Sequence, residues 1–493
     1  MTPVNGSPPN SDSDQPSDKL SGKVIAVIAV LVATAFVMML NETALSVALP
    51  DVMEEFDITA SVAQWALTGV MLTMAIVMPM TGWILDRFTT RQVYFFAVIF
   101  FLIGSIVAAL SPTFMVMFLG RVLQAVGTAI VMPLQMTVVM NIVPPHRRGS
   151  IMGIISIVMA VGPALGPTFA GLIMSFSTWH MTFWIMAVLV AIAGLVAMRY
   201  LQNVGTTKES PLDFVSVVLS AFAFGGLVYG LSSIGMIVTG APGATAAIVI
   251  SIVGVVGLIL FIWRQLATAK SGKALLNLAP LKVKNFVVAV IVIMAFQMAL
   301  LGVSNTLPLY LQGALLVSVL VAGMVNLPGG IVETLISPIS GALYDRIGPR
   351  PLVIPGALIA AGSLYAMATT DHTTSVWFIV VMFAILSIGI GLALTPLMTT
   401  SLSSLPGEIY THGSAIMNTL MQLAGAAGTA VMIAIFDVVS AAGGGTPEAQ
   451  GEGGSRAFLV AAILLSVAFV FSLFIQRPDL SGSVKTVEPA EPK

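Results

Sequence analysis

"GWILDRFTTR" occupies residues 82–91, and 259 residues later the chain repeats its pattern as "GALYDRIGPR", residues 341–350. Gly, Asp and both Arg stand at matching places in the two copies. The same offset connects Gly166 in "VGPALGP" with Gly425 in "LAGAAGTA". A chain built from two repeated halves is typical of transporters that work by alternating access. The repeat therefore predicts two related helical bundles.

The composition places these bundles in a lipid bilayer. Apolar residues make up 57% of the 493 residues, charged residues only 8%, and the mean hydropathy is +1.02. Soluble domains carry about 25% charged residues, so we predict a protein that crosses the membrane many times. The absence of cysteine excludes disulfides and thiolate metal sites. The net charge of −1 and the four scattered histidines give no sign of nucleic-acid or metal binding.

Apolar segments long enough to cross the bilayer, which takes about 20 residues, recur along the whole chain. The fourteen that we find lie near residues 24–49, 62–83, 93–110, 113–141, 150–174, 182–200, 213–234, 244–263, 285–311, 319–343, 351–370, 375–397, 412–437 and 456–476. An even number of spans places both termini on one side. With the N-terminus inside, 18 of the 20 Lys and Arg residues fall in inner loops and tails, which predicts cytoplasmic termini. Of the other two, Arg456 faces outward and Arg121 lies in a span.

The repeat and the spans together define the expected domains. Two halves of six spans leave two spans over, which we place as an insert between the halves. Residues 1–22 are polar and proline-rich and are expected to form a disordered cytoplasmic tail. The remaining domains are an N-terminal six-helix bundle over 23–200, the two-helix insert with its linkers over 201–284, a C-terminal six-helix bundle over 285–476 and a cytoplasmic tail over 477–493.

Three charged residues, Glu42, Arg121 and Glu333, lie well inside predicted spans. A charge at the bilayer centre costs roughly 2.5–3.5 kcal/mol, so such residues usually face a cavity or a partner. Glu42 precedes Pro50 by eight residues, and Arg121 follows Pro112 by nine. At about 1.5 Å per helical residue, both are expected roughly 12–14 Å from the outer surface. We therefore predict that Glu42 and Arg121 pair.

The predicted pair has two interpretations. Burial favours the neutral acid and a nearby guanidinium favours the carboxylate, so a pair that separates during transport would take up a proton only in some conformations. A pair that never separates would only fix how two helices pack. Glu333 follows Pro328, Gly329 and Gly330, which are expected to loosen that helix. It is either a second proton site or a cation-binding group, or a protonated glutamate bonded to a neighbouring span.

The two copies of the repeated motif predict a latch at the cytoplasmic surface. Its members are the acidic and basic residues at these helix ends, Asp86, Arg87 and Arg91 after the second span and Asp345, Arg346 and Arg350 after the tenth. A carboxylate and a guanidinium across adjacent helix ends would hold the outward-facing state, and breaking the contact would favour the inward-facing state. The alternative is that the positive residues only anchor the helix ends to the cytoplasm.

Further motifs, in their order along the chain, resemble those of the major facilitator superfamily. They are "LNETALSVALP" (40–50), "RVLQAVGTA" (121–129), "GPALGP" (162–167), "LPLYLQ" (307–312) and "HGSAIMNTLMQLAGAAG" (412–428), together with the repeated loop. The chain most resembles the fourteen-span drug:proton antiporters of the EmrB/QacA type, with lincomycin-resistance efflux proteins nearest. The resemblance covers residues 24–476. It departs from the family pattern at Asn41, where aspartate is usual and where Glu42 stands next to it.

The resemblance implies a fold and an activity. The fold is an all-α polytopic membrane protein with 14 transmembrane helices, in which two six-helix bundles and two inserted helices form the major facilitator fold. The activity is proton-coupled efflux, a drug:H⁺ antiport that exports lipophilic or amphiphilic compounds, cationic ones among them, by alternating access. The partners are then a small-molecule substrate, protons and the lipid bilayer, with no cofactor beyond the proton gradient. We expect a monomer in the bacterial cytoplasmic membrane.

The resemblance and the residues also give the remaining site candidates. The antiporter motif of the fifth span is Gly162, Pro163, Gly166, Pro167 and Gly171, whose small residues permit close helix approach and whose prolines bend the helix. Polar and aromatic residues that could line the substrate cavity are Asn41, Gln64, Trp65, Gln124, Gln135, Gln297, Asn305, Tyr310, Asn326, Asn418 and Gln422.

Other functions remain to be weighed against drug efflux. A proton-coupled exporter of a specific metabolite, such as an amino acid or a lipid precursor, would show the same pattern, because one fold serves many substrates. An enzyme is disfavoured because the chain has no clustered catalytic His, Cys or carboxylate set. An ATP-driven pump is disfavoured because no GxxxxGK[ST] motif is present.

Overall fold

A computed structural model of the protein describes residues 21–478, apart from 59, 64, 205–206, 208–211, 235–236, 238–239, 241–242 and 270–273. The regular elements in these residues are helices. They are α1 (Gly22–Phe56), α2 (Ala60–Ala63), α3 (Trp65–Arg87), α4 (Thr90–Ala109), α5 (Phe114–Ile142), α6 (Arg148–Met174), α7 (Trp179–Tyr200), α8 (Phe214–Ser232), α10 (Ala244–Ala269), α11 (Lys284–Gly313), α12 (Val319–Ile347), α13 (Arg350–Met367), α14 (Val376–Ser403), α15 (Tyr410–Ala442) and α16 (Pro447–Ser472), with 3₁₀ turns before α6, α11 and α15.

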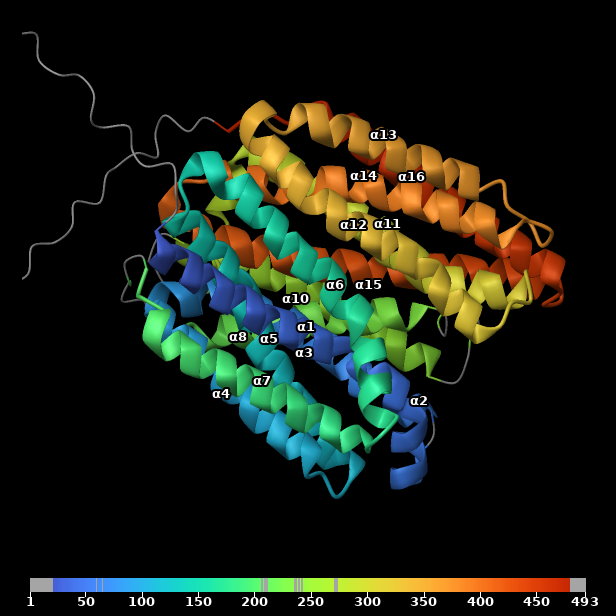
Figure 1. Cartoon of the computed structure of the whole chain (residues 1–493), viewed down its shortest axis with the longest axis horizontal. Helices are drawn as coiled ribbons and strands as arrows, with labels where there is room; N and C mark the ends of the chain where they lie inside the picture. The colour runs from blue at the N-terminus through green and yellow to red at the C-terminus, as the bar shows by residue number, and fades with distance from the viewer. Residues whose placement is uncertain are drawn as a thin grey trace, which may run out of the picture.

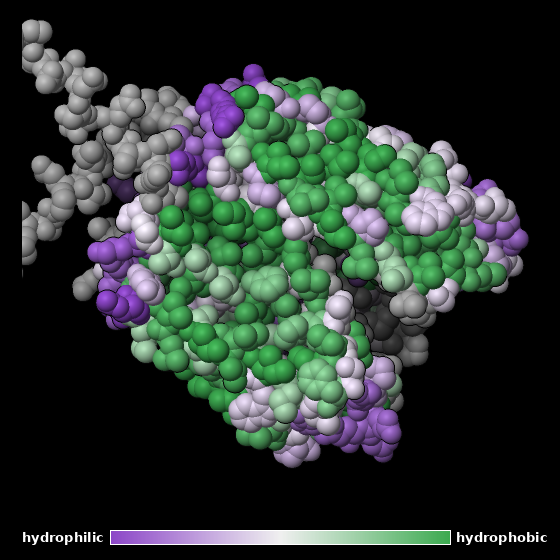
Figure 2. Space-filling view, in the orientation of Figure 1, coloured by the Kyte–Doolittle hydropathy of each residue, from purple (hydrophilic) through white to green (hydrophobic). Residues whose placement is uncertain are grey.

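Each predicted span falls largely on one long helix. Twelve of the described helices are long and apolar enough to cross a membrane, and α6 and α12 are not among these twelve. Figure 2 shows the matching surface, with apolar residues over the middle of the molecule and polar residues gathered toward its ends. A membrane-spanning, all-helical fold is therefore what the structure has, while the crossing of all fourteen helices stays a prediction.

Prolines interrupt the helices less than the sequence predicts. α1 continues through Pro50 to Phe56, and Asp57 then ends it with a φ of 51°. One lost donor does not break the helix there, because the following turn packs Val52 with Trp179 and Phe183 of α7.

The expected loosening of α12 after Pro328 is also not seen, since the helix runs unbroken from Val319 to Ile347. The glycine that follows Pro328 serves packing instead. A Cβ atom on Gly329 would lie 2.5 Å from Phe383 and 2.7 Å from Ser387 of α14, so the missing side chain lets α14 approach.

The predicted start of the last span is nine residues too late. α16 begins at Pro447, with Thr446 as its N-cap. Its first turns, "PEAQGEGGSR", are too polar and glycine-rich to be recognised as part of a span. Proline suits the first helical position because its missing N–H has no intrahelical partner there. Packing then fixes the turns that follow, since Gly454 lies directly against the ring of Tyr310.

The helices form two groups with an insert against them. The first group, α1 with α3 to α7, fills the lower part of Figure 1, and the second group, α11 to α16, fills the upper part. The groups meet where α6 packs on α12 and where α3 packs on α15. The insert is α8 and α10, which pack on each other, and α8 contacts both α3 and α15.

The two groups are not in equal contact along their length. We call the end where α1 begins and α16 ends, at the left of Figure 1, the terminal end, and the opposite end the far end. The groups meet at the terminal end and diverge toward the far end, where Figure 2 shows a notch between them.

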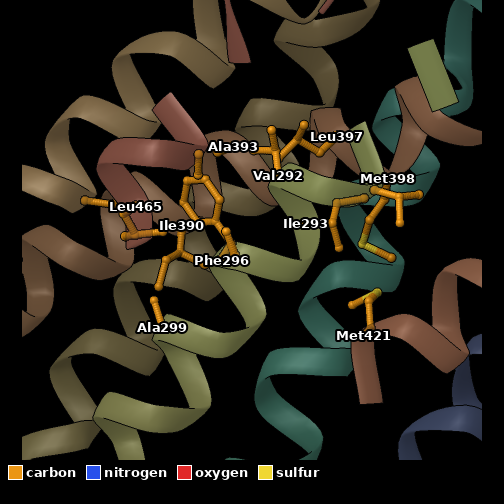
Figure 3. Close-up of a cluster of buried hydrophobic side chains, with 14 of the residues drawn as sticks. Val292, Ile293, Phe296, Ala299, Ile390, Ala393, Leu397, Met398, Met421 and Leu465 are labelled. Carbon is orange, nitrogen blue, oxygen red and sulfur yellow. The ribbon is translucent and has the colours of Figure 1, made fainter. Parts of the chain in front are cut away.

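The interior of the second group is filled by branched and aromatic side chains. Figure 3 shows α11 contributing Val292, Ile293 and Phe296, which meet Ile390 and Leu397 of α14. All five are at most 1% exposed. In a bilayer such helices are held by close packing rather than by removal of apolar surface from water. This packing makes the second group a firm body on which polar residues can be positioned.

Candidate functional site

Arg121 ties three helices of the first group together. Its side chain is only 1% exposed and is the largest of the fully buried side chains in the described residues. The guanidinium on α5 donates to the main-chain carbonyls of Asn41 and Glu42 on α1, both at 3.0 Å. It also donates to the side chain of Gln124 at 3.1 Å and to the carbonyl of Ala66 on α3 at 3.5 Å. The planar fork of arginine can serve several acceptors at once.

Glu42 lies next to Arg121, close enough for the two charges to interact as the predicted pairing requires, but the hydrogen bond between the two residues runs through the main chain of Glu42. The guanidinium bonds the carbonyl oxygen of Glu42, and the carboxyl oxygen Oε2 is buried without a hydrogen-bond partner. The physical reason is that a helical carbonyl keeps a second lone pair, so two consecutive carbonyls of α1 can accept from one guanidinium.

A buried amide network continues from this point into the first group. Asn41 donates to Gln124 at 3.2 Å, and Gln124 donates to the hydroxyl of Ser105 on α4 at 2.8 Å. Asn41 Oδ1 has no partner. The acidic group of Glu42 therefore lies at the edge of a polar network with spare acceptor sites.

The glycines of α6 lie against the segment of α1 that carries Glu42. A Cβ atom on Gly162 would lie 2.7 Å from Met39, and one on Gly166 would lie 2.5 Å from the carbonyl of Leu40. Gly171 is further from α1, with Val47 at 4.0 Å. Of the predicted motif, the three glycines thus face α1. The other two members, Pro163 and Pro167, fall within α6, but their side chains lie outside the described part of the chain.

Glu333 belongs to the second group, on α12, and is 9% exposed. Its main chain faces α14, since a Cβ atom on Gly391 would lie 3.6 Å from the carbonyl of Glu333. Asn326 stands two turns earlier on α12, and its Oδ1 is buried without a partner. The second group thus also holds a buried acid with an unsatisfied amide on the same helix.

Asp86, at the end of α3, contacts the start of α15 in the other group. The hydroxyl of Thr411 donates to its Oδ1 at 2.6 Å, and Nε2 of His412 lies 3.2 Å from its Oδ2. His412 is buried. The first copy of the repeated motif thus reaches across to the second group.

Asp345, the matching residue on α12, contacts the start of α6. It accepts from the main-chain N–H groups of Gly149 at 2.8 Å and Ser150 at 2.9 Å, and from the hydroxyl of Ser150 at 2.7 Å. A carboxylate at a helix N-terminus satisfies free donors and interacts favourably with the helix dipole. Each aspartate of the repeat therefore joins its own group to the first turn of a helix in the other group.

The arginines of the repeat have other positions than a carboxylate–guanidinium latch requires. Arg91 donates to the carbonyl of Met198 in its own group at 3.2 Å, and Arg350 to that of Ile475 in its own group at 2.6 Å. Arg346 lines a cavity of about 320 Å³ with His146 and Arg147 at the terminal end. Arg87 ends α3. The prediction of direct ion pairs is thus corrected for Arg91 and Arg350.

Several predicted cavity residues lie where the two groups face each other. Asn418 of α15 donates to the sulfur of Met136 on α5 at 3.2 Å, and Gln422 approaches the sulfur of Met74 on α3 at 4.0 Å. Gln135 is fully buried, and its Oε1 lacks a partner. Amide side chains of α15 thus lie against methionine sulfurs of the first group at the seam between them.

Other members of the predicted cavity have different surroundings. Tyr310 is fully buried inside the second group and donates to the carbonyl of Asp371 at 2.7 Å. Trp65 stacks on Tyr229 of the insert, with ring centroids 5.9 Å apart. Asn305 bonds Thr429 between α11 and α15 at 3.2 Å. Gln297 of α11 lies beside Gly425 of α15, and Gln64 lies outside the described residues.

The site also contains residues that the sequence did not point to. His412, Thr411 and Ser150 complete the contacts of the two aspartates, and Ser105 completes the amide network. The repeat locates the aspartates but not their partners. Because all three partners of the aspartates stand in the first turn of a helix that follows a 3₁₀ turn, a search for polar residues at helix starts would have found them.

A comparison with protein-family models decides the family. Residues 31–429 match the model described as Major Facilitator Superfamily. The chain belongs to the major facilitator superfamily. This match confirms the predicted resemblance. Members of this superfamily are multi-pass membrane transporters rather than enzymes.

Individual relatives agree with this assignment. The superfamily member described here is 40% identical over 462 residues to the lincomycin resistance protein LmrB of Listeria monocytogenes, covering 92% of this chain and 97% of that protein. It is 38% identical over 465 residues to LmrB of Bacillus subtilis, covering 92% and 96%. The solved human organic anion transporter MFSD10 (TETRAN) shares the fold, with a TM-score of 0.65, 15% identity, and coverage of 92% of this chain and all of that one.

Proposed function

We propose that this transporter is a drug:H⁺ antiporter that exports lipophilic or amphiphilic compounds, cationic ones among them, by alternating access. The observation that carries the proposal is the buried, unpartnered Oε2 of Glu42 beside the guanidinium of Arg121. The kinship with lincomycin resistance proteins supports drugs as the substrates.

The surroundings of Glu42 suit a proton carrier. Exclusion from water favours the neutral acid, while the positive charge of Arg121 favours the carboxylate. Because the guanidinium is anchored on main-chain carbonyls rather than on the carboxyl group, a change in the charge of the acid leaves that anchor intact. A small shift of α1 or entry of water then decides whether Glu42 holds a proton. Glu333 is proposed as a second such site.

The contacts between the groups support the outward-facing state of an alternating-access cycle. We place the terminal end in the cytoplasm, as the Lys and Arg distribution predicts. The aspartates Asp86 and Asp345 close that end across the groups, and the far end diverges (Figure 1). Loss of both contacts would let the groups rock into the inward-facing state.

The seam between α15 and the first group is the proposed substrate path. Methionine side chains adapt to ligands of different shape, and amides beside them supply hydrogen bonds. Met74 and Met136 with Gln422 and Asn418 give this combination. Such a lining accepts several amphiphilic compounds rather than one.

The remaining parts of the proposal concern the architecture. Residues 23–200 and 285–476 form the two six-helix bundles, 201–284 holds the insert, and fourteen helices cross the membrane. The protein acts as a monomer and needs no cofactor beyond the proton gradient. Because the chain contains no cysteine, single cysteines at either end can be labelled with an impermeant maleimide in intact cells to test the orientation.

The decisive experiment uses proteoliposomes with an imposed pH gradient. Uptake of ethidium and of lincomycin is followed for the wild type, Glu42→Gln and the control Glu452→Gln, which changes an exposed acid paired with Arg456. We expect gradient-driven accumulation in the wild type and the control, and none in Glu42→Gln although it still binds substrate. Accumulation by Glu42→Gln would refute the role of this residue. No gradient-driven movement of either drug would favour a dedicated metabolite exporter.

A further inference from the structure

We infer that the two-helix insert holds the terminal end closed through the linker residues 274–278, and that His412 is the side chain on which this linker acts. The inference rests on the proposed alternating access and assigns a role to the insert and to its linker. His412 is then a positioning residue for the gate between α3 and α15.

The insert lies on the seam that has to move. α8 contacts both α3 of the first group and α15 of the second. α8 and α10 are held together closely, since a Cβ atom on Gly226 would lie 2.6 Å from Gly254 and one on Gly257 would lie 3.0 Å from Ala223. The two helices are therefore packed closely together, and they lie across the seam between α3 and α15.

The terminal end of the insert is fixed by polar side chains. Asp213 caps α8 and forms two hydrogen bonds with Arg264 of α10, both at 2.8 Å. One turn further into α8, Ser216 accepts from Gln265 at 2.8 Å. A bidentate carboxylate–guanidinium pair holds its partners in a defined geometry.

The same Gln265 attaches the linker. It is 1% exposed, and its Oε1 accepts from the main-chain N–H of Leu276 at 3.0 Å. Leu275 and Leu276 are themselves buried. The linker is therefore anchored to the insert by a buried hydrogen bond and by two apolar side chains.

The next linker residue reaches the gate. The main-chain N–H of Asn277 donates to Nδ1 of His412 at 3.2 Å. Since Nδ1 is the acceptor, the proton of the neutral imidazole lies on Nε2, which faces Oδ2 of Asp86 at 3.2 Å. The linker thus selects the form of His412 that can donate to Asp86.

Gly82 makes room for this arrangement on α3. A Cβ atom there would lie 2.5 Å from Nδ1 of His412 and 3.3 Å from the side chain of Leu276. The imidazole and the linker are therefore both held against α3 and α15 at once. When α3 and α15 separate at this end, the linker has to lose its contact with at least one of them. Its simultaneous contacts with both helices therefore stabilise only the closed state.

The test uses the cysteine-free chain directly. Spin labels on Phe88→Cys and Ile347→Cys, which are 41% and 44% exposed and belong to different groups at the terminal end, report the distance across the gate in proteoliposomes. His412→Gln keeps a donor near the position of Nε2, which reaches Asp86, but places no acceptor at the position of Nδ1, which faces Asn277. His412→Asn keeps the acceptor and cannot reach Asp86.

We expect His412→Gln to raise the ratio of long to short distances about two- to tenfold, the effect of losing one net hydrogen bond. Asn277→Pro, which lacks the N–H, should give the same shift, and Asn277→Ala, which keeps the N–H and loses only the side-chain bond to the N–H of Ala279, should give a smaller one. An unchanged distribution in His412→Gln, with a shift in His412→Asn alone, would overturn the inference. Size-exclusion profiles identify any variant that fails to fold, and His412→Gln decides the matter if Asn277→Pro is lost.

The measurement needs neither substrate nor pH gradient, so it is separable from the proposed function. If the distances shift in His412→Gln but the wild type shows no gradient-driven drug transport, the insert's role is supported and the antiport is refuted. If the wild type shows gradient-driven drug transport but the distances do not shift in His412→Gln, the antiport is supported and the insert's role is refuted.

Discussion

Replacing Gly166 by alanine should separate α6 from α1 beside the proposed proton-coupling site. The added Cβ would lie 2.5 Å from the carbonyl of Leu40 and 3.1 Å from the amide of Ala44, and it would overlap the hydroxyl of Thr43. Two of these atoms belong to the main chain and cannot rotate away. Comfortable carbon–oxygen contacts need about 3.5 Å, so α6 must move by about 1 Å. Overpacking of this kind costs about 1–3 kcal/mol.

Gly171→Ala is the matched control for this prediction. It is the same change on the same helix, but the nearest atom, on Val47, is 4.0 Å away, an ordinary contact. Alanine even favours a helix over glycine by about 0.8–1.0 kcal/mol. In detergent, followed by tryptophan fluorescence on heating, we expect a clearly lower melting temperature for Gly166→Ala and an unchanged or higher one for Gly171→Ala. Equal melting temperatures for the two variants would refute close α1–α6 packing at Gly166.

Three further variants test other contacts. Arg121→Lys leaves one ammonium for carbonyls on α1 and α3, so we expect a lower melting temperature and no gradient-driven uptake; wild-type uptake would contradict the anchoring role. The bond to Arg264 holds the pKa of Asp213 at about 2, below its ordinary 3.8. The stability that this ion pair gives the folded protein is therefore complete above pH 3.8 and is lost as the pH falls through 2. The difference in melting temperature between the wild type and Asp213→Asn should therefore stay the same from pH 8 to about pH 5 and shrink at lower pH. A difference that vanishes already near neutral pH would contradict the pair. Asp345→Asn replaces one of two acceptor oxygens at the start of α6, so the spin-label distances should shift toward the open terminal end, and an unaltered distribution would exclude a latch at Ser150.

The helices could be predicted from the sequence because apolar runs of sufficient length have few alternatives in a bilayer. The proximity of Glu42 and Arg121 also followed from counting residues along the helices. Their actual bonding did not, because it depends on the rotation of α1 about its axis, and the glycines of α6 and the guanidinium of α5 set that rotation together. Residue spacing gives depth in the membrane, but not the direction in which a side chain points.

The same limit applies to two of the predicted cavity residues, whose contacts in the structure are with neighbouring helices and loops. Tyr310 and Trp65 are aromatic residues near the ends of long helices, where stacking on a drug and packing on a neighbouring helix need the same residue type. The partners of the two aspartates escaped prediction for another reason. Every residue except proline has a main-chain N–H, so the sequence does not single out a donor such as that of Gly149. In a capping interaction between distant helices, the sequence therefore points to the carboxylate but not to the N–H groups that bind it.

The hydrogen bonds from Arg121 to main-chain carbonyls affect which substitutions this region can accept during evolution. A carbonyl oxygen is the same whichever side chain its residue carries, so the guanidinium remains satisfied when residues 41 and 42 are exchanged. Here the amide of Asn41 stands first, and the acid of Glu42 follows at the next position. The acid can therefore move by one residue without any rebuilding of its cationic neighbour. Main-chain anchoring leaves this part of the transporter open to evolutionary drift in the position of its acid.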